Sequence, residues 1–428
     1  FLKERKHLKL MDKLIIKGNA DLKGSIKIKG SKNAALPIMI SSLLSNETLK
    51  LKNIPKLDDI KNMIKLLRSY GSTIKRNKDQ LEISCKNIIN KDADYDIVRK
   101  MRASILILGP LISRFGTAKI SLPGGCAIGT RPIDIHLEGL KKLGANFSIE
   151  NGYVVGQVKN GLVGNHVPLS FPSVGATENI MMASTLAKGK TIIENAAMEP
   201  EIFDLAGCLN KMGAKIKIKN NGIIQIDGVS RLVTSSHKIM SDRIVAGTFI
   251  IAAVMLNKKF EVKDIDTDDL GALIKALESM GANLKIKKNQ IHIMPTNELK
   301  GIKIETAPHP GFPTDLQAQI MALMCLAKGK SQIKENIFEN RFMHVPELNR
   351  LGASIRVKKD LAFISGSRKF KGAQVMASDL RASVSLVLAA LCAEGMSEIN
   401  RVYHLDRGYE KIENTLGKLG PSIKRHKY

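Results

Sequence analysis

Cys126 lies in a segment whose residue types could support chemistry, SLPGGCAIGTRP at 121–132. Gly124 and Gly125 precede the cysteine, and Arg131 follows it. A nearby guanidinium favours the thiolate over the thiol, and the thiolate is the reactive form of cysteine. A buried structural cysteine is the alternative, because free cysteine usually behaves as a small core residue. The surrounding glycines favour a surface loop, so we expect Cys126 to be reactive.

The remaining cysteines lie in runs typical of core strands and helices. The sequence has five cysteines in all and no C-x-x-C pair. An odd count without paired spacing indicates neither a disulfide framework nor a zinc site. We therefore expect a reduced, cytoplasmic protein without a metal or cofactor. The four cysteines are Cys85, Cys208, Cys325 and Cys392.

In the first half of the chain, several short segments place charged or small residues ahead of an apolar run. In GSKNAALP, Lys32 and Asn33 follow a turn glycine and precede the run 34–44. A helix N-terminus assisted by a lysine suits a phosphate group, whereas a solvated turn is the plainer alternative. Arg102 in KMRAS has a similar place, and SVGAT at 173–177 is a further helix start.

The second half carries a carboxylate and more arginines in comparable settings. Asp315 in APHPGFPTDLQAQ stands near a helix start, where N-capping alone would explain it. Arginines at successive helix starts indicate a polyanionic substrate, because the guanidinium group suits carboxylate and phosphate. Together with the thiol, a well-placed carboxylate indicates proton transfer. The other charged residues of this half are Arg341, Asp379, Arg381, Asp406 and Arg407.

The sequence offers little support for other functions. The sequence contains no Walker loop, no G-x-G-x-x-G motif and no metal-ligand cluster, so neither ATP hydrolysis nor hydride transfer is indicated. The net charge of +27 suggests nucleic-acid binding. However, the lysines are spread along every segment and aromatic residues make up only 4%, which leaves few rings to stack on bases. We expect no nucleic-acid partner.

Membrane and targeting signals are weak. The longest apolar runs, such as 247–256, are too short to span a bilayer. The basic start FLKERKHLKL has no apolar region of the kind that signal peptides carry. We therefore expect no membrane partner, and a flexible extension at 1–10 ahead of Met11.

A sixfold repeat must position these residues. A helix ending in glycine, followed by a β-hairpin, recurs with successive glycines 68 to 73 residues apart. In the first copy the apolar residues of 60–70 fall at helical spacing, and in the third they alternate around the turn at Asn221 and Gly222. A fixed period is typical of a repeated supersecondary unit. The glycines are Gly71, Gly144, Gly213, Gly281, Gly352 and Gly420.

A second phrase, a helix followed by a strand, lies between these copies, as in LAKGKTIIENAA at 186–197. Each unit should therefore hold two helices and about four strands. We expect two α/β domains of three units each. The first would span 32–240 and carry the Cys126 loop, and the second would combine 11–31 with 241–428. The active site is expected in the cleft between them, because pockets favour domain interfaces.

Eight segments, in order, closely resemble the enolpyruvyl transferase family, in particular its members that act on UDP-N-acetylglucosamine. They are GSKNAALP, VRKMRAS, SLPGGCAIGTRP, SVGAT, APHPGFPTDLQAQ, FENRFMHVPEL, DLRAS and DRGYE. The resemblance runs from Met11 to about Arg425 and implies an inside-out α/β barrel in two domains, built from six βαβαββ units. It implies transfer of the enolpyruvyl group of phosphoenolpyruvate to the 3′-hydroxyl of the UDP-sugar with release of phosphate. This is the first committed step of peptidoglycan synthesis.

The resemblance also implies roles for individual residues. Cys126 would donate a proton to the methylene carbon of phosphoenolpyruvate and could form a covalent adduct with it, while Asp315 would accept the proton of the sugar hydroxyl. The residues expected to hold phosphoenolpyruvate are Lys32, Asn33, Arg131 and Arg407. Those expected to contact the UDP-sugar are Asn33, Arg102, Arg131, Pro132, Ile133, Asp134, Ile135, Phe171, Pro172, Ser173, Val174, Gly175, Asp315 and Ile337. Those expected to line the cleft are Arg341, Asp379 and Arg381.

One departure and two alternatives accompany this interpretation. Relatives commonly carry a lysine where this chain has Phe171, so diphosphate binding would depend more on Arg102 and Arg131. The sister enzyme that acts on shikimate 3-phosphate shares the fold, but it lacks a cysteine loop of this kind, and PGGC and RPIDIH disfavour it. An inactive basic anion-binding protein on the same fold is disfavoured because the acid, the base and the cations are intact. The sequence makes no prediction of oligomeric state.

Overall fold

The chain divides into two units, each with its own hydrophobic core. The computed structural model describes residues 12–89, 95–98, 101–122, 133–367 and 369–427. Within them, the first unit runs from Lys29 to Asp242, and the second combines the residues up to Ile28 with those from Arg243 onward. The predicted extension at 1–10 lies outside the described residues.

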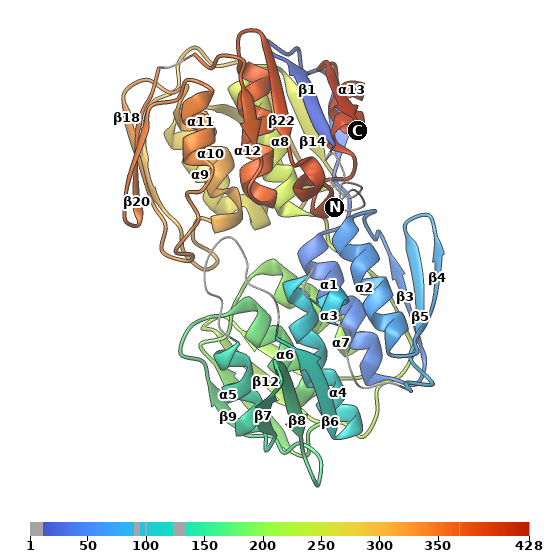
Figure 1. The fold of residues 1–428 in the computed structure, drawn as a ribbon. Helices are drawn as coiled ribbons and strands as arrows, with labels where there is room; N and C mark the ends of the chain where they lie inside the picture. The colour runs from blue at the N-terminus through green and yellow to red at the C-terminus, as the bar shows by residue number, and fades with distance from the viewer. Residues whose placement is uncertain (1–11, 90–94, 99–100, 123–132, 368, 428) are drawn as a thin grey trace, which may run out of the picture. The chain divides into compact units, whose positions relative to one another are not determined.

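The first unit consists of three sheets and the helices that they cover (Figure 1). Its elements are α1 (Lys32–Ser41), η1 (Ser42–Leu44), β3 (Thr48–Lys52), α2 (Asp58–Ser69), β4 (Thr73–Asn77), β5 (Gln80–Ser84), α3 (Tyr95–Val98), η2 (Arg102–Ile107), α4 (Leu108–Phe115), β6 (Thr117–Ser121), α5 (Asp134–Lys142), β7 (Asn146–Glu150), β8 (Tyr153–Gln157), β9 (His166–Pro168), α6 (Val174–Ser184), β10 (Lys190–Glu194), α7 (Pro200–Lys211), β11 (Lys215–Lys219), β12 (Ile223–Asp227) and β13 (Ser235–Lys238).

The second unit repeats this plan. Its elements are β1 (Lys13–Lys17), β2 (Ser25–Lys27), α8 (Arg243–Met255), β14 (Phe260–Lys263), η3 (Asp268–Leu270), α9 (Gly271–Ser279), β15 (Asn283–Lys287), β16 (Gln290–Met294), β17 (Lys303–Glu305), η4 (Thr314–Leu316), α10 (Gln317–Met324), β18 (Lys330–Lys334), α11 (Val345–Arg350), β19 (Ile355–Lys358), β20 (Leu361–Ser365), β21 (Gln374–Met376), α12 (Leu380–Cys392), β22 (Met396–Asn400), η5 (Val402–Arg407), α13 (Ile412–Lys418) and β23 (Ile423–His426).

One repeat shows the plan on which the six are built. In the sheet β9–β10–β12–β11, β9 and β10 are parallel with α6 between them in the chain, α7 follows, and β11 and β12 form an antiparallel hairpin. This is a βαβαββ unit. The register pairs Ile216 with Ile226 and Ile218 with Ile224, as the alternation around the predicted turn requires. Within the described residues five sheets have four strands and the sheet of β6, β8 and β7 has three, which confirms the predicted sixfold repeat.

Three strands join sheets far from their own place in the chain. β13 pairs with β3, and β2 pairs with β14. β1 lies between β22 and β23, so the N-terminal strand completes the sixth repeat. The sequence predicted the number of repeats but not these exchanges, because strand pairing across such separations leaves no local signal.

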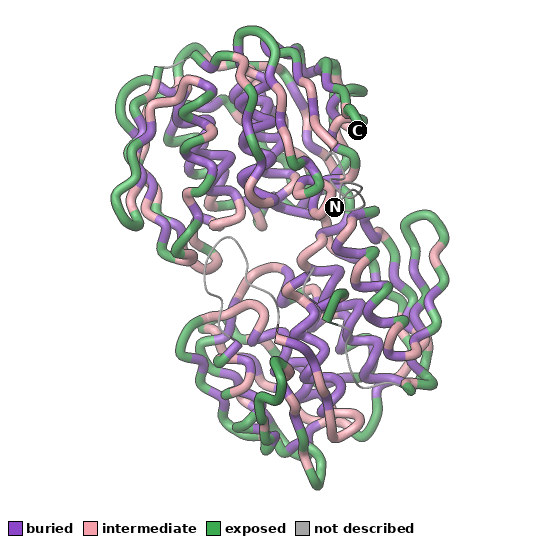
Figure 2. Tube along the Cα trace, in the orientation of Figure 1, coloured by how far each residue is buried: buried purple, intermediate pink, exposed green. Residues whose placement is uncertain are grey.

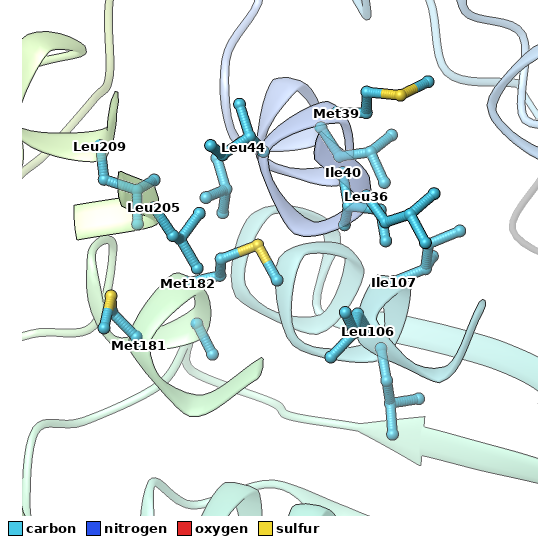
Figure 3. Packing of buried hydrophobic residues seen from close by; sticks show 14 of the residues in the cluster. Leu36, Met39, Ile40, Leu44, Leu106, Ile107, Met181, Met182, Leu205 and Leu209 are labelled. Carbon is cyan, nitrogen blue, oxygen red and sulfur yellow. The ribbon is translucent and has the colours of Figure 1, made fainter. Parts of the chain in front are cut away.

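In each unit the first helices of the repeats form the interior and the sheets form the outside. The sequence of α8, RIVAGTFIIAAVM, is apolar on every face, as a helix surrounded by protein requires. Figure 2 shows such helices buried along their length, while strands alternate between buried and exposed residues. In the first unit, Leu36 and Ile40 of α1 and Met182 of α6 belong to one cluster of buried apolar side chains (Figure 3). Burial of each such side chain stabilises the fold by roughly 1.5–3 kcal/mol.

The six predicted helix-ending glycines all have positive φ, between 92° and 114°. A residue with a Cβ is strained there, so glycine at this place ends each helix. A hairpin follows the first five glycines, but the hairpin expected after Gly420 is wrong, because the single strand β23 follows it and pairs with β1. In the described part of the chain, no helix is long and apolar enough to cross a membrane.

Candidate active site

Three of the predicted site residues lie outside the described residues. They are Cys126, Arg131 and Pro132, which belong to the segment 123–132. The remaining predicted residues are described, and they form two groups, one in each unit.

Lys32 opens α1, two residues earlier than the predicted apolar run. Ser31 caps the helix by accepting a hydrogen bond from the Ala34 N–H at 3.3 Å. The Lys32 ammonium group lies 3.4 Å from Oδ2 of Asp59, and its backbone N–H donates to Oδ2 of Asp242 at 3.2 Å. The Lys32 side chain is only 12% exposed and Asp59 is buried, so a solvated turn is the wrong interpretation of this residue.

A buried amide ties the other helix starts of the first unit together. The Asn179 side chain accepts a hydrogen bond from the Gly109 N–H at 2.8 Å and donates to the Ile105 carbonyl at 3.2 Å. Its amide nitrogen also lies 3.2 Å from Nδ1 of His136 in α5. A Cβ on Gly175 would lie 3.1 Å from the His136 ring, so glycine permits this close approach of α6 to α5. The starts of α5 and α6 therefore adjoin η2.

The predicted UDP-sugar contacts of this unit lie at these starts. Arg102 is the first residue of η2, and Ser173 caps α6. Phe171 is 42% exposed and provides no charge at this place. Among the other predicted contacts, Ile133 is buried, and Asp134 is exposed and opens α5. The half-buried residues are Asn33, Arg102, Ile135, Pro172, Ser173, Val174 and Gly175.

Asp315 is held between two arginines. Oδ1 accepts a hydrogen bond from Arg341 at 2.7 Å, and Oδ2 accepts one from Arg381 at 2.6 Å. The residues at the N-cap positions of η4 and α10 are Pro313 and Leu316, so N-capping was the wrong interpretation of Asp315. Both arginine side chains are buried, whereas the Asp315 side chain is 27% exposed. The buried arginines therefore orient the carboxylate, and its exposed part remains accessible to solvent.

The N-cap of α12 supports this group. Asp379 caps the helix by accepting hydrogen bonds from the N–H groups of Arg381 and Ala382 at 2.9 and 3.1 Å. His344 is almost fully buried, and burial lowers its pKa to about 4, with Asp379 raising it and Arg341 lowering it further. His344 is therefore neutral near pH 7. Sequence reasoning missed His344, although it stands three residues after Arg341 in a recognised segment.

Ile337 and Arg407 are the remaining predicted contacts. The Ile337 N–H donates to Oε1 of the buried Glu335 at 2.9 Å. Arg407 ends η5 and is half-buried. Its neighbour Asp406 accepts two hydrogen bonds from Arg425, at 2.7 and 2.8 Å, so this turn is anchored to β23. Sequence reasoning gave no role to Glu335 or Arg425.

The described cysteines lie in core elements, as the sequence predicted. Burial raises the pKa of Cys85, and it raises those of Cys208, Cys325 and Cys392 to about 12. Cys392 is partly exposed as a residue, but its thiol shares the raised pKa. All four are therefore protonated near neutral pH and are poor nucleophiles.

The second unit also contains a cavity of about 510 Å³. Its wall includes apolar residues of α9 and the loop 309–313. It also includes Pro313 and Leu316, which flank Thr314 and Asp315 in the sequence. Among the described residues, no group of three or more histidines, cysteines or carboxylates could hold a metal ion.

Comparisons with known proteins agree on one family. A family model described as EPSP synthase (3-phosphoshikimate 1-carboxyvinyltransferase) matches residues 16–416. A UDP-N-acetylglucosamine 1-carboxyvinyltransferase from Pelagibacter ubique is 52% identical over 415 residues, which cover 97% of this chain and 100% of that protein. One of the same name from Trichlorobacter lovleyi is 50% identical, with 97% and 99% covered.

Solved structures agree on the fold. The enolpyruvyl transferase NikO from Streptomyces tendae superposes with a TM-score of 0.89 at 22% identity, covering 98% of this chain and 99% of its own. EPSP synthase from Acinetobacter baumannii superposes with a TM-score of 0.76 at 18% identity, with 97% and 100% covered. The predicted enolpyruvyl transferase fold is confirmed.

Proposed function

The chain belongs to the EPSP synthase family of enolpyruvyl transferases, and from that membership we infer that it is a UDP-N-acetylglucosamine 1-carboxyvinyltransferase. It transfers the enolpyruvyl group of phosphoenolpyruvate to the 3′-hydroxyl of UDP-N-acetylglucosamine and releases phosphate, in peptidoglycan synthesis. The observation that carries this inference is 52% identity over 415 residues to a relative of that name.

Proton transfer at two places accounts for the addition step. The methylene carbon of phosphoenolpyruvate gains a proton from Cys126, and the neighbouring carbon is attacked by the sugar oxygen, whose proton passes to Asp315. The resulting methyl group then returns a proton to the Cys126 thiolate that the addition leaves, while the carbon–oxygen bond to phosphate breaks, and the double bond is restored. Acid and base must meet the substrates from different directions, so they come from different segments of the chain.

The paired arginines fix the orientation of Asp315 for the role of base. Two charge-assisted hydrogen bonds hold the carboxylate in one orientation, while its 27% exposed side chain leaves room for the approach of a hydroxyl group. Oriented groups contribute to rate because a misplaced base loses most of its effect.

Fixed cations neutralise the substrate anions. We assign the phosphate and carboxylate of phosphoenolpyruvate to Lys32, Asn33, Arg131 and Arg407. The Asp59 contact supports this for Lys32, because it holds the ammonium group in place at the start of α1. Arg102 and the starts of α5 and α6 would take the UDP-sugar. Helix N-termini attract anionic groups, which suits a diphosphate.

The substrates are small and soluble, and we place the reaction in the cytoplasm. The description of the family model names 3-phosphoshikimate, but relatives at about 50% identity over nearly the whole chain are named for the UDP-sugar, so the shikimate alternative is not favoured. A phosphate-release assay with each acceptor tests the assignment. Release with UDP-N-acetylglucosamine alone supports it, and release with shikimate 3-phosphate alone overturns it.

A further inference from the structure

We propose that Glu335 is a positioning residue. It keeps the turn that carries Asp315 at a fixed distance from the backbone of Ile337. The proposal rests on the proposed function, since it concerns how the acceptor hydroxyl is aligned. Glu335 follows directly after β18, and its own N–H donates to the Asp360 carbonyl at 2.9 Å, which ties its backbone to the hairpin of β19 and β20.

The Glu335 carboxylate uses both oxygens, and each faces a different segment. Oε1 accepts hydrogen bonds from the N–H groups of Ile337 at 2.9 Å and Phe338 at 3.2 Å. Oε2 accepts one from the Thr314 hydroxyl at 3.0 Å. Thr314 directly precedes Asp315, so one side chain links the turn of the proposed base to the loop of a proposed sugar contact.

Burial makes this link demanding. Glu335 is only 5% exposed, and a buried carboxylate is costly unless its oxygens are satisfied. A carboxylate that only closed the turn 335–338 would need no contact with a residue 21 positions earlier. The contact with Thr314 is therefore the feature that a local capping role does not explain.

A second contact closes the same arrangement. Arg341, at the end of the loop that Glu335 organises, lies with Nη2 3.4 Å from the Thr314 carbonyl and 2.7 Å from Oδ1 of Asp315. The arginines orient the Asp315 carboxylate, while Glu335 holds the backbone from which that carboxylate extends. If the Thr314 contact is lost, the turn that carries Asp315 can shift away from the loop that carries Ile337. The Asp315 carboxylate and Ile337 then no longer contact the same substrate in the correct relative position.

Two substitutions test the link, with a conservative partner for one of them. Glu335→Gln keeps the shape but replaces one acceptor oxygen with a donor, and Thr314→Val removes the hydroxyl donor. Both should lower kcat about tenfold and raise KM for UDP-N-acetylglucosamine several-fold, with KM for phosphoenolpyruvate unchanged. Thr314→Ser retains the hydroxyl and should remain near wild type. Both variants remove the same contact between Thr314 and Glu335, so the double variant should lose little more kcat than either single variant.

Glu298→Gln serves as the matched control, because Glu298 is about half exposed and pairs with Lys328 in the same unit. It should leave all kinetic constants unchanged. Thermal unfolding followed by circular dichroism separates folding from positioning, since kinetics are measured well below each variant's transition. A folded Glu335→Gln or Thr314→Val with wild-type kcat and KM overturns the proposal, and so does equal loss with Thr314→Ser. A wild-type protein that releases no phosphate with this acceptor overturns the proposed function instead, and the positioning role with it.

Discussion

Arg381 donates a hydrogen bond of 2.6 Å to Oδ2 of Asp315, although 66 residues separate them in the sequence. Arg381 belongs to α12 of the sixth repeat, and Asp315 precedes α10 of the fifth. Asp379 caps α12 and accepts a hydrogen bond from the Arg381 N–H. This contact fixes the backbone from which the Arg381 guanidinium group extends. Packing of successive repeats therefore builds the group that we assign to proton acceptance.

Replacement of Asp315 by Asn should abolish most turnover. The amide cannot accept the hydroxyl proton, so kcat should fall by about a hundredfold or more. Arg341 and Arg381 would also lose a charged partner in a mostly buried setting, which should lower the free energy of unfolding by about 1–3 kcal/mol. Steady-state kinetics and denaturant unfolding measure the two effects. Asp21→Asn, at an exposed ion pair, is the control, and retention of normal kcat by Asp315→Asn would exclude the proposed base.

Lys32→Gln should lower kcat/KM for phosphoenolpyruvate by about a hundredfold, because a fixed cation in a desolvated site contributes several kcal/mol to binding of a developing anion. Lys369→Gln, whose side chain is 83% exposed, should have no effect. The comparison separates one placed cation from the overall positive field. Equal losses in the two variants would show that net charge, rather than Lys32, attracts the substrate.

The buried His344 should make stability depend on pH in acid. Its pKa is lowered to about 4 in the folded protein, chiefly by burial, and is near 6.5 when unfolded. Between these values the unfolded state binds the extra proton, so the free energy of unfolding falls as pH falls from about 6.5 towards 4, by at most roughly 1.4 kcal/mol per pH unit. Denaturant unfolding of wild type and His344→Asn across this range measures the difference. Identical pH slopes in the two proteins would contradict the assignment.

An epoxide that mimics phosphoenolpyruvate, such as fosfomycin, should alkylate Cys126 and inactivate the enzyme. The described cysteines have raised pKa values caused by burial and should not react. Peptide mass mapping after treatment identifies the labelled thiol. Cys126→Asp should keep some turnover and resist the epoxide, whereas a label on Cys85, Cys208, Cys325 or Cys392 would refute the assignment.

The sequence predicted what depends on neighbouring residues. Gly213 ends a helix and Asn221 with Gly222 turns a hairpin because backbone conformation at these places is decided locally. The motifs also led to Asp315, Arg341 and Arg381 as members of one site. Their contact was not predicted, and Asp315 could equally have been a helix cap, because only packing of separate repeats brings the arginines to it.

Other features left no signal to interpret. Glu335 is one glutamate after one strand, and only the folded chain brings Thr314 to its carboxylate. β1 completes the sheet of the sixth repeat through pairing with β22 and β23, although nearly the whole chain lies between them. The Glu335 contact forms inside the fifth repeat, whereas the β1 pairing depends on the closed arrangement of three repeats, which periodicity indicates but does not specify.

The central claim is that this chain joins the enolpyruvyl group to UDP-N-acetylglucosamine, and mass spectrometry of the nucleotide product tests it most directly. Purified protein is incubated with phosphoenolpyruvate and equal amounts of UDP-N-acetylglucosamine and shikimate 3-phosphate. The account predicts that UDP-N-acetylglucosamine gains one enolpyruvyl group for each phosphate released, while shikimate 3-phosphate is unchanged. An enolpyruvyl group found on shikimate 3-phosphate, with UDP-N-acetylglucosamine unmodified, would contradict it.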